Sequence, residues 1–166
     1  MRDRKINVLF VSRRGDARSL LAGACLQHVG GPRFRVAACG EPGELAREPH
    51  PLVAVTLQRA HIEAPPLKVQ DWDGFRRVGA RRFDFVITLD AEVERRRPAW
   101  PGQPTVALWE YPDLLAHQES GEALEPQFSR MLLSLRRRLD LLVSLSQREA
   151  SRADLRSDVR DLAFVS

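Results

Sequence analysis

The segment Asn7–Ala24 (NVLFVSRRGDARSLLAGA) contains the residues whose types and spacing best suit chemistry on an anion. An apolar run ends at Ser12, and a polar stretch leads through Arg18 and Ser19 into an apolar-periodic segment. This pattern predicts a strand, a tight loop and the start of a helix. Backbone N–H groups of such a loop converge on a tetrahedral oxyanion, and the helix dipole adds to the attraction.

Within this loop, Arg18 can bind two oxygens of the anion through its guanidinium fork. Ser19 can cap the helix or donate to Ser12. An acid at Asp16 opposes anion binding unless a neighbouring arginine neutralises it. The loop lacks the Gly-Lys-Ser/Thr ending of an ATP-binding loop, which argues against nucleotide hydrolysis. The candidate phosphate-binding residues are Arg13, Arg14, Gly15, Asp16, Ala17, Arg18 and Ser19.

Strands alternate with helices along the rest of the chain. We expect strands at 6–11, 34–38, 83–89 and 105–108, and helices at 19–29, 51–59 and 126–146. We also expect a helical turn from Asp71 through Phe75 and Val78, and a long polar connection over 109–126. This order predicts a three-layer α/β/α sandwich around a four-stranded parallel sheet. Ligands of such sheets gather at the carboxyl ends of the strands, where residues 12–18 lie.

The length of 166 residues suits one domain, which we place at 1–146. Residues 147–166 form a charged extension that keeps Leu155, Val159 and Leu162 at helical spacing. We expect a short helix there, packed on the domain or on a partner chain, which makes a homodimer one hypothesis.

The composition is that of an ordinary globular protein, with 43% hydrophobic and 29% charged residues. We find no membrane-length apolar run and no secretory signal, so we expect a cytoplasmic location without membrane attachment. The net charge of +4 is nearly all arginine, which favours phosphate, sulfate or a phosphorylated ligand. The excess is too small to argue for nucleic acid.

The two cysteines and four histidines predict neither a metal site nor a cofactor. Cys25 and Cys39 lack the close spacing of zinc ligands, and the histidines are scattered. We expect Cys25 to be a small buried residue and Cys39 to be structural.

The loop sequence VLFVSRRGDARS resembles the signature of the low-molecular-weight protein tyrosine phosphatase and arsenate reductase superfamily. That signature is an apolar strand, a cysteine, five residues, an arginine and a Ser/Thr, and Ser12 to Ser19 has this spacing. Three later segments are similar to the family in the same order, so that the resemblance covers roughly residues 5–145. They are VAACGEPGELAREPHPLVAVTLQRAHIE, FDFVITLD and ALWEYPDL.

The resemblance implies a specific mechanism. The family attacks phosphate or arsenate with a thiolate, stabilises the transferring group with an arginine and protonates the leaving oxygen with an aspartate. By position, Arg18 matches the arginine and Asp113 is the candidate general acid. The family has Asp before Pro, whereas here Pro112 precedes Asp113, so Glu110 is a second candidate and an ordinary turn is a third interpretation.

The nucleophile position departs from the family, because Ser12 stands where the thiol is needed. A serine hydroxyl without a neighbouring base is a poor nucleophile at neutral pH. Gly15 also replaces the asparagine that the family commonly has. The thiol-relay arsenate reductases need further cysteines near the third strand, and TLDAEVERRRP holds none.

Three hypotheses follow. The first is a phosphatase-like protein that binds phosphate-type oxyanions with little or no hydrolysis. The second is an active phosphoric monoester hydrolase whose cysteine at position 12 was replaced by serine. The third is a regulatory or scaffold protein with a vestigial loop, acting through the 147–166 extension or the arginine-rich stretches 95–97 and 136–138; the alternative for those stretches is an ordinary solvated face.

Overall fold

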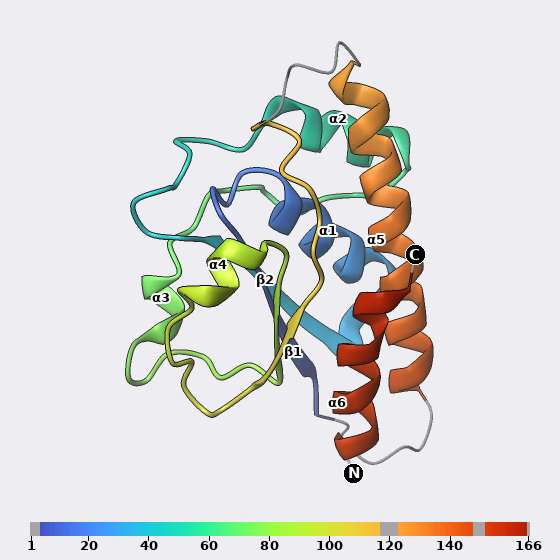
Figure 1. Ribbon diagram of the computed structural model, residues 1–166. Helices are drawn as coiled ribbons and strands as arrows, with labels where there is room; N and C mark the ends of the chain where they lie inside the picture. The colour runs from blue at the N-terminus through green and yellow to red at the C-terminus, as the bar shows by residue number, and fades with distance from the viewer. Residues whose placement is uncertain (1–3, 117–122, 148–151, 166) are drawn as a thin grey trace.

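The computed structural model describes residues 4–116, 123–147 and 152–165, and its centre is a four-stranded parallel sheet (Figure 1). The strands are β1 (Ile6–Ser12), β2 (Phe34–Gly40), β3 (Phe85–Thr88) and β4 (Thr105–Leu108), in the order β2-β1-β3-β4. Helices cover both faces, which confirms the predicted three-layer α/β fold.

Both faces of β1 are buried, which explains its unbroken apolar run. Side chains alternate along a strand, so Val8 and Phe10 belong to one core cluster while Leu9 and Val11 belong to the other. All four are at most 1% exposed. This burial fixes where the strand ends and therefore where the Ser12 loop begins.

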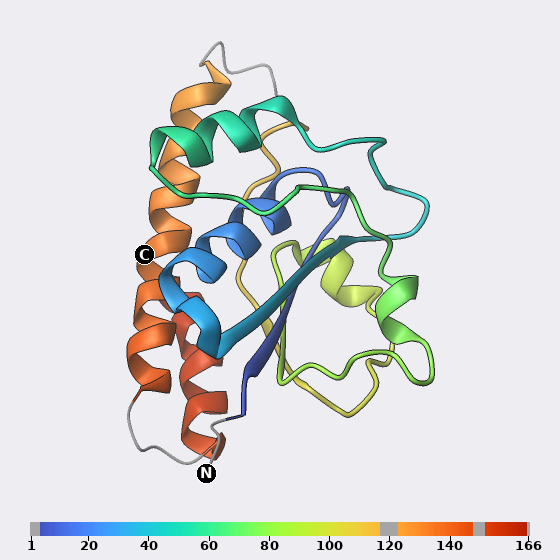
Figure 2. The same ribbon diagram turned by 180° about the vertical axis from the view of Figure 1, so that it is seen from behind.

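One face carries the long helices α1 (Arg18–Gly30), α2 (Pro51–Arg59) and α5 (Leu124–Ser146). Figures 1 and 2 show α1 between the sheet and α5. The first nine residues of α1 are buried as a consequence, including Arg18 and Ser19. Pro51 opens α2 as its first residue, in agreement with the predicted start of that helix.

The other face carries only the short helices α3 (Asp73–Arg76) and α4 (Ala91–Arg95) among the described residues. The helical turn expected to run through Val78 ends at Arg76, and Val78 is fully exposed. Gly79 follows with φ of +86°, a turn conformation that a continued helix does not allow. Helix α4 was not predicted from the sequence, because five residues are too few to show apolar side chains at helical spacing.

The C-terminal part forms α6 (Arg152–Asp161) and the 3₁₀ turn η3 (Leu162–Phe164). Val159 and Leu162 are buried in the same cluster as α1 and α5, and α6 packs against β4 and α5. Residues 148–151 and 166 of the predicted extension, and 117–122 of the predicted connection, lie outside the described residues. Across the described helices, none is both long and apolar enough to cross a membrane.

Candidate functional site

The Ser12–Ser19 loop lies at the carboxyl end of β1, where the strand order of the sheet changes direction. From β1 the chain leads to β2 on one side, and β3 lies on the other side, with Ser12 opposite Gly40 and Val11 opposite Thr88. Ligands of open parallel sheets bind at such a switch point. The fold therefore places the loop where an anion site is expected.

The loop turns its carbonyl groups outward. The carbonyls of Arg13, Arg14 and Asp16 accept from the amides of Glu41, Ala46 and His50 at 2.9, 3.1 and 2.9 Å. In a trans peptide the N–H points opposite to the C=O. The N–H groups of Arg14, Gly15 and Ala17 consequently point to the inner side of the loop, as an oxyanion cradle requires.

Gly15 meets two constraints that a larger residue would violate. Its φ is +68°, which is in the left-handed region that favours glycine. A Cβ at this position would lie 3.1 Å from the amide nitrogen of Gly40, and a Cβ on Gly40 would lie 2.6 Å from that of Gly15. Two glycines thus allow the loop and the end of β2 to touch.

Ser12 and Ser19 form a buried pair at the base of the loop. The Ser12 hydroxyl donates to Ser19 Oγ at 2.8 Å, and the residues are 2% and 0% exposed. Ser19 does not cap α1, whose N-cap is Ala17. Within the described residues, no histidine or carboxylate hydrogen-bonds to Ser12, so no base activates its hydroxyl.

Arg18 is buried behind the loop and binds acceptors from three directions. Its Nη1 donates to the carbonyls of Tyr111 at 2.9 Å and Leu89 at 3.3 Å, while its Nη2 donates to Asp90 Oδ2 at 3.0 Å. Asp113 Oδ2 lies 3.8 Å from the same Nη2. The charge of Arg18 is therefore fixed beside the loop rather than free in solvent.

Asp90 belongs to the candidate site, although the sequence patterns did not single it out. Its carboxylate accepts from Arg13 Nη2 at 3.2 Å, from Arg18, and from the amides of Glu92 and Val93 at the start of α4. Burial raises the pKa of Asp90, but the hydrogen bond from Arg13, that from the Val93 amide and the charge of Arg18 outweigh it and hold the pKa below its usual range. An aspartate directly after an apolar strand and before Ala-Glu is a helix N-cap signal that could have revealed it.

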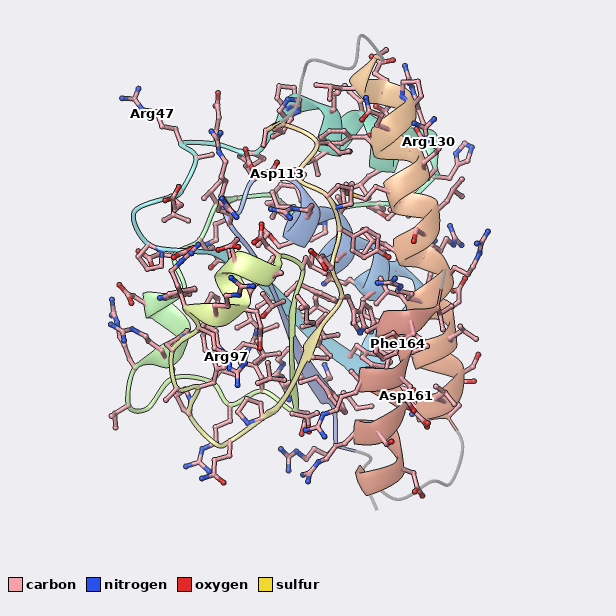
Figure 3. The ribbon with its side chains drawn as sticks, in the orientation of Figure 1. Arg47, Arg97, Asp113, Arg130, Asp161 and Phe164 are labelled. Atoms are coloured by element: carbon pink, nitrogen blue, oxygen red, sulfur yellow. The ribbon has the colours of Figure 1, made fainter. Side chains whose placement is uncertain are left out.

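Asp113 lies beside the N-terminal end of α1, at the mouth of the loop (Figure 3). Its Oδ1 accepts from the Leu115 amide at 3.1 Å, which fixes the turn that carries it. Glu110, the alternative acid, is exposed and does not line the pocket over the loop. Of the two candidates, Asp113 alone lies next to Arg18.

The pocket over the loop is small. Its volume is about 10 Å³, which is room for about one water molecule. A phosphate or sulfate ion is larger than this space, and the turn from Asp113 to Leu115 forms part of its wall. Ten residues line the pocket: Ser12, Arg14, Asp16, Ala17, Arg18, Asp113, Leu114, Leu115, Phe128 and Met131.

Asp16 faces the same pocket and adds negative charge to it. Desolvation by burial raises the pKa of this carboxyl group, and the nearby charge of Arg14 partly opposes that rise. Arg14 Nε lies 3.8 Å from Asp16 Oδ2, so Arg14 supplies the neutralising charge, whereas Arg13 pairs with Asp90.

The two cysteines lie away from the pocket. Burial raises the pKa of Cys25 to about 12 and also raises that of Cys39, so both thiols stay protonated at neutral pH. Neither lines the loop pocket, and the geometry gives no support to a thiol relay. In the part of the chain that the structure describes, no three His, Cys, Asp or Glu side chains gather to hold a metal ion.

Solved structures of arsenate reductases and of low-molecular-weight phosphatases are similar to this chain in fold. A thioredoxin-dependent arsenate reductase of Corynebacterium glutamicum is 23% identical, with a TM-score of 0.59 over 89% of this chain and 66% of that chain. An arsenate reductase in its phosphate-binding state is 22% identical, with a TM-score of 0.64 over 84% and 98%. A low-molecular-weight protein tyrosine phosphatase of Streptococcus pyogenes is 15% identical, with a TM-score of 0.64 over 87% and 95%.

No family model and no curated protein matches the sequence. The structural likeness nevertheless confirms the predicted fold: the chain has the architecture of the low-molecular-weight phosphatases and arsenate reductases.

Proposed function

We propose that this protein binds a phosphate-type oxyanion in the Ser12–Ser19 loop, with hydrolysis absent or very weak. The observation that carries the proposal is the outward orientation of the loop carbonyls, which turns the N–H groups of Arg14, Gly15 and Ala17 inward beside the guanidinium of Arg18. The likeness to an arsenate reductase in the phosphate-binding state adds support.

An incoming oxyanion would take the place of the Asp113 carboxylate. That carboxylate makes the longest contact of Arg18, at 3.8 Å, and its side chain is 23% exposed, whereas Asp90 is 7% exposed and hydrogen-bonded to Arg18. Replacing Asp113 thus costs less than replacing Asp90. The anion would then accept from the loop amides and from Arg18 at once.

The lack of turnover follows from Ser12. Its hydroxyl has no base among the described residues and donates to Ser19, so an alkoxide is not formed at neutral pH. The loop can hold a phosphate ester without supplying the nucleophile that breaks it.

Calorimetric titration with phosphate and with sulfate tests the proposal. We expect one saturable site in the natural protein, and loss of about 100-fold or more in affinity in Arg18→Ala, since a buried charged hydrogen-bond donor is removed. Arg35→Ala removes the same charge from an exposed position near the start of β2 and is expected to bind normally. If the alanine variant does not fold, Arg18→Lys is measured in its place, because lysine keeps a positive charge beside Asp90. Undiminished binding in the folded Arg18 variants would overturn the proposal.

A second candidate function is phosphomonoester hydrolysis with cysteine at position 12. The observation that favours it is the retained geometry, with Ser12 hydrogen-bonded to Ser19 and Asp113 beside Arg18. A thiolate there would form a bond to phosphorus, while the ester oxygen leaves with the phosphorus–oxygen electron pair and takes a proton from Asp113. Water would then hydrolyse the thiophosphate intermediate to phosphate and thiol.

Hydrolysis of an aryl phosphate by Ser12→Cys tests this candidate. The candidate would be supported if Ser12→Cys hydrolyses the aryl phosphate, Ser12→Ala does not, and adding Asp113→Asn to Ser12→Cys reduces the rate. The absence of aryl phosphate hydrolysis by a folded Ser12→Cys protein would count against this candidate. If neither binding nor hydrolysis is found, the loop is vestigial and a regulatory or scaffold role is favoured.

A further inference from the structure

One buried arginine of α5 binds the end of the C-terminal segment. Arg138 Nε donates to the carbonyl of Val165 at 2.9 Å, and its Nη2 donates to that of Ala163 at 3.3 Å. Arg138 is 8% exposed, whereas both interpretations of the arginine-rich stretch 136–138 place it at the surface. A guanidinium thus links α5 to the last residues that the structure describes.

The same guanidinium lies over two aromatic rings of the segment that follows β4. Its central carbon is 4.8 Å from the ring centre of Tyr111 and 5.9 Å from that of Trp109. Trp109 Nε1 donates to the carbonyl of Val159 in α6 at 3.0 Å, and the Tyr111 hydroxyl pairs with Ser134 Oγ at 3.0 Å. The 109–111 segment is consequently held by α5 and α6 together.

This segment in turn positions the oxyanion site. The Tyr111 carbonyl accepts from Arg18 Nη1 at 2.9 Å, and the Tyr111 amide donates to Leu89, whose carbonyl also accepts from Arg18. Asp113 follows two residues later and lies beside Arg18. A displacement of Tyr111 would therefore move an acceptor of Arg18 and the turn that carries Asp113.

From this continuous set of contacts we infer that Arg138 is a positioning residue for the oxyanion loop, and that the segment from Arg152 to Val165 sets the affinity of the loop through it. Arg138 holds the carbonyls of Ala163 and Val165 on one side and the Tyr111 ring on the other. Tyr111 then fixes Arg18. The inference rests on the proposed oxyanion binding, and it assigns a role to the C-terminal segment.

The test compares two arginines that both bind backbone carbonyls and both link α5 to another segment: Arg138 lies in α5, and Arg33 binds its last residue. Arg138→Met keeps a long apolar side chain but removes every donor, while Arg138→Lys keeps the charge without the fork. Arg33→Met is the matched control, because Arg33 Nη2 donates to the Ser146 carbonyl at 2.7 Å at the far end of α5. A purely structural role of Arg138 would lower stability, as the Arg33 change does, without altering the affinity of the folded protein.

Two measurements on the full chain decide the matter. The first is the phosphate dissociation constant of the folded species by NMR titration, expected to rise about tenfold in Arg138→Met and to stay unchanged in Arg33→Met. The second is the Nε–Hε signal of Arg18 in phosphate-free protein, assigned by its loss in Arg18→Lys. We expect this signal to move in Arg138→Met and Arg138→Lys, and to stay in place in Arg33→Met.

Unchanged affinity together with an unmoved Arg18 signal in both Arg138 variants would overturn the inference. If the natural protein binds no phosphate, the proposed function fails, and the Arg18 signal alone then decides whether the C-terminal segment is coupled to the loop. If Arg138→Met does not fold, Arg138→Lys supplies both measurements.

Discussion

Two buried arginines stabilise two regions of this molecule in different ways. Arg18, behind the oxyanion loop, binds two backbone carbonyls and the carboxylate of Asp90. Arg138, beneath the C-terminal segment, also binds two backbone carbonyls but lies over the rings of Trp109 and Tyr111 instead. Among the described residues, no carboxylate forms an ion pair with Arg138.

The difference separates a charge that can exchange partners from one that cannot. Arg18 has in Asp113 a second, weaker carboxylate at 3.8 Å, which an incoming anion can replace. The described partners of Arg138 are all neutral, and two of them are carbonyls at the end of the C-terminal segment. The first arginine suits binding, and the second suits assembly of the fold. The predictions below test this contrast.

The largest effect is expected from Asp90→Asn, which leaves Arg13 and Arg18 without their hydrogen-bonded carboxylate. We expect a loss of about 3 kcal/mol in the free energy of unfolding at pH 7, the cost of breaking a buried ion pair. The pKa of Asp90 is lower in the folded protein than in the unfolded chain, where it is about 3.9. Its contribution to the free energy of unfolding is therefore complete above the unfolded pKa and is lost as pH falls through the folded pKa. Urea unfolding at pH 7 and in acid measures this: the gap between the two proteins should close in acid.

Arg138→Met is expected to lower the free energy of unfolding by about 2 kcal/mol, the value of hydrogen bonds to a charged group. Its partners are carbonyls and rings, so this loss should be the same at pH 7 and in mild acid. The same unfolding experiment checks it. If the loss of stability in Arg138→Met also disappeared in acid, as we expect for Asp90→Asn, the contrast between neutral partners of Arg138 and a carboxylate partner of Arg18 would be wrong.

A glycine series sharpens the picture of the loop. Gly15→Ala is expected to cost about 2 kcal/mol, because alanine there has an unfavourable φ and meets the Gly40 backbone at 3.1 Å. Gly43→Ala is the control: its φ is +88°, but nothing lies within 4 Å of its Cβ, so only the conformational cost of about 1 kcal/mol remains. Equal losses in thermal unfolding would remove the argument for a tight contact between the loop and β2.

The smallest effect concerns Asp16 and the pH dependence of anion binding. Since burial raises the pKa of Asp16, its negative charge is lost earlier than usual as pH falls, and the pocket becomes more favourable for anions. Sulfate keeps its charge between about pH 4 and pH 7, and it should bind more tightly at the acidic end of this range than at neutral pH. Asp16→Asn should bind sulfate about threefold more tightly than the natural protein at neutral pH.

Comparing the sulfate affinities of the natural protein and of Asp16→Asn over the same pH range isolates the contribution of Asp16, because the two proteins differ in that carboxyl group alone. An Asp16→Asn protein with the same pH profile as the natural one would show that Asp16 does not oppose the anion.

The elements with strong local signals were predictable. The β1 strand follows from a run that is apolar on both faces, and α2 begins at Pro51 because proline suits the first turn of a helix. The loop and its Arg18 were predictable because the strand-to-helix spacing is local in the sequence. Their roles in binding stay predictions until the titrations are made.

The partners of the two arginines were not predictable, because they depend on contacts between distant segments. Asp90 is 72 residues from Arg18 in the sequence, and Val165 is 27 residues from Arg138. The stretch 136–138 was interpreted either as an interaction surface or as a solvated face, although Arg138 shares the spacing of Leu135 and Leu142 on the buried side of α5. The helical spacing predicts the burial of Arg138 correctly, because aromatic rings and backbone carbonyls can bind a buried guanidinium.

The central claim is that the loop amides and Arg18 together bind an oxyanion. Titration of ¹⁵N-labelled protein with phosphate tests it most directly, by following the amide signals of Arg14, Gly15 and Ala17. We expect saturable shifts in these amides and in the Arg18 Nε–Hε signal, and none of these amide shifts in Arg18→Ala. Shifts spread over exposed arginines without saturation, with the loop amides unmoved, would contradict it.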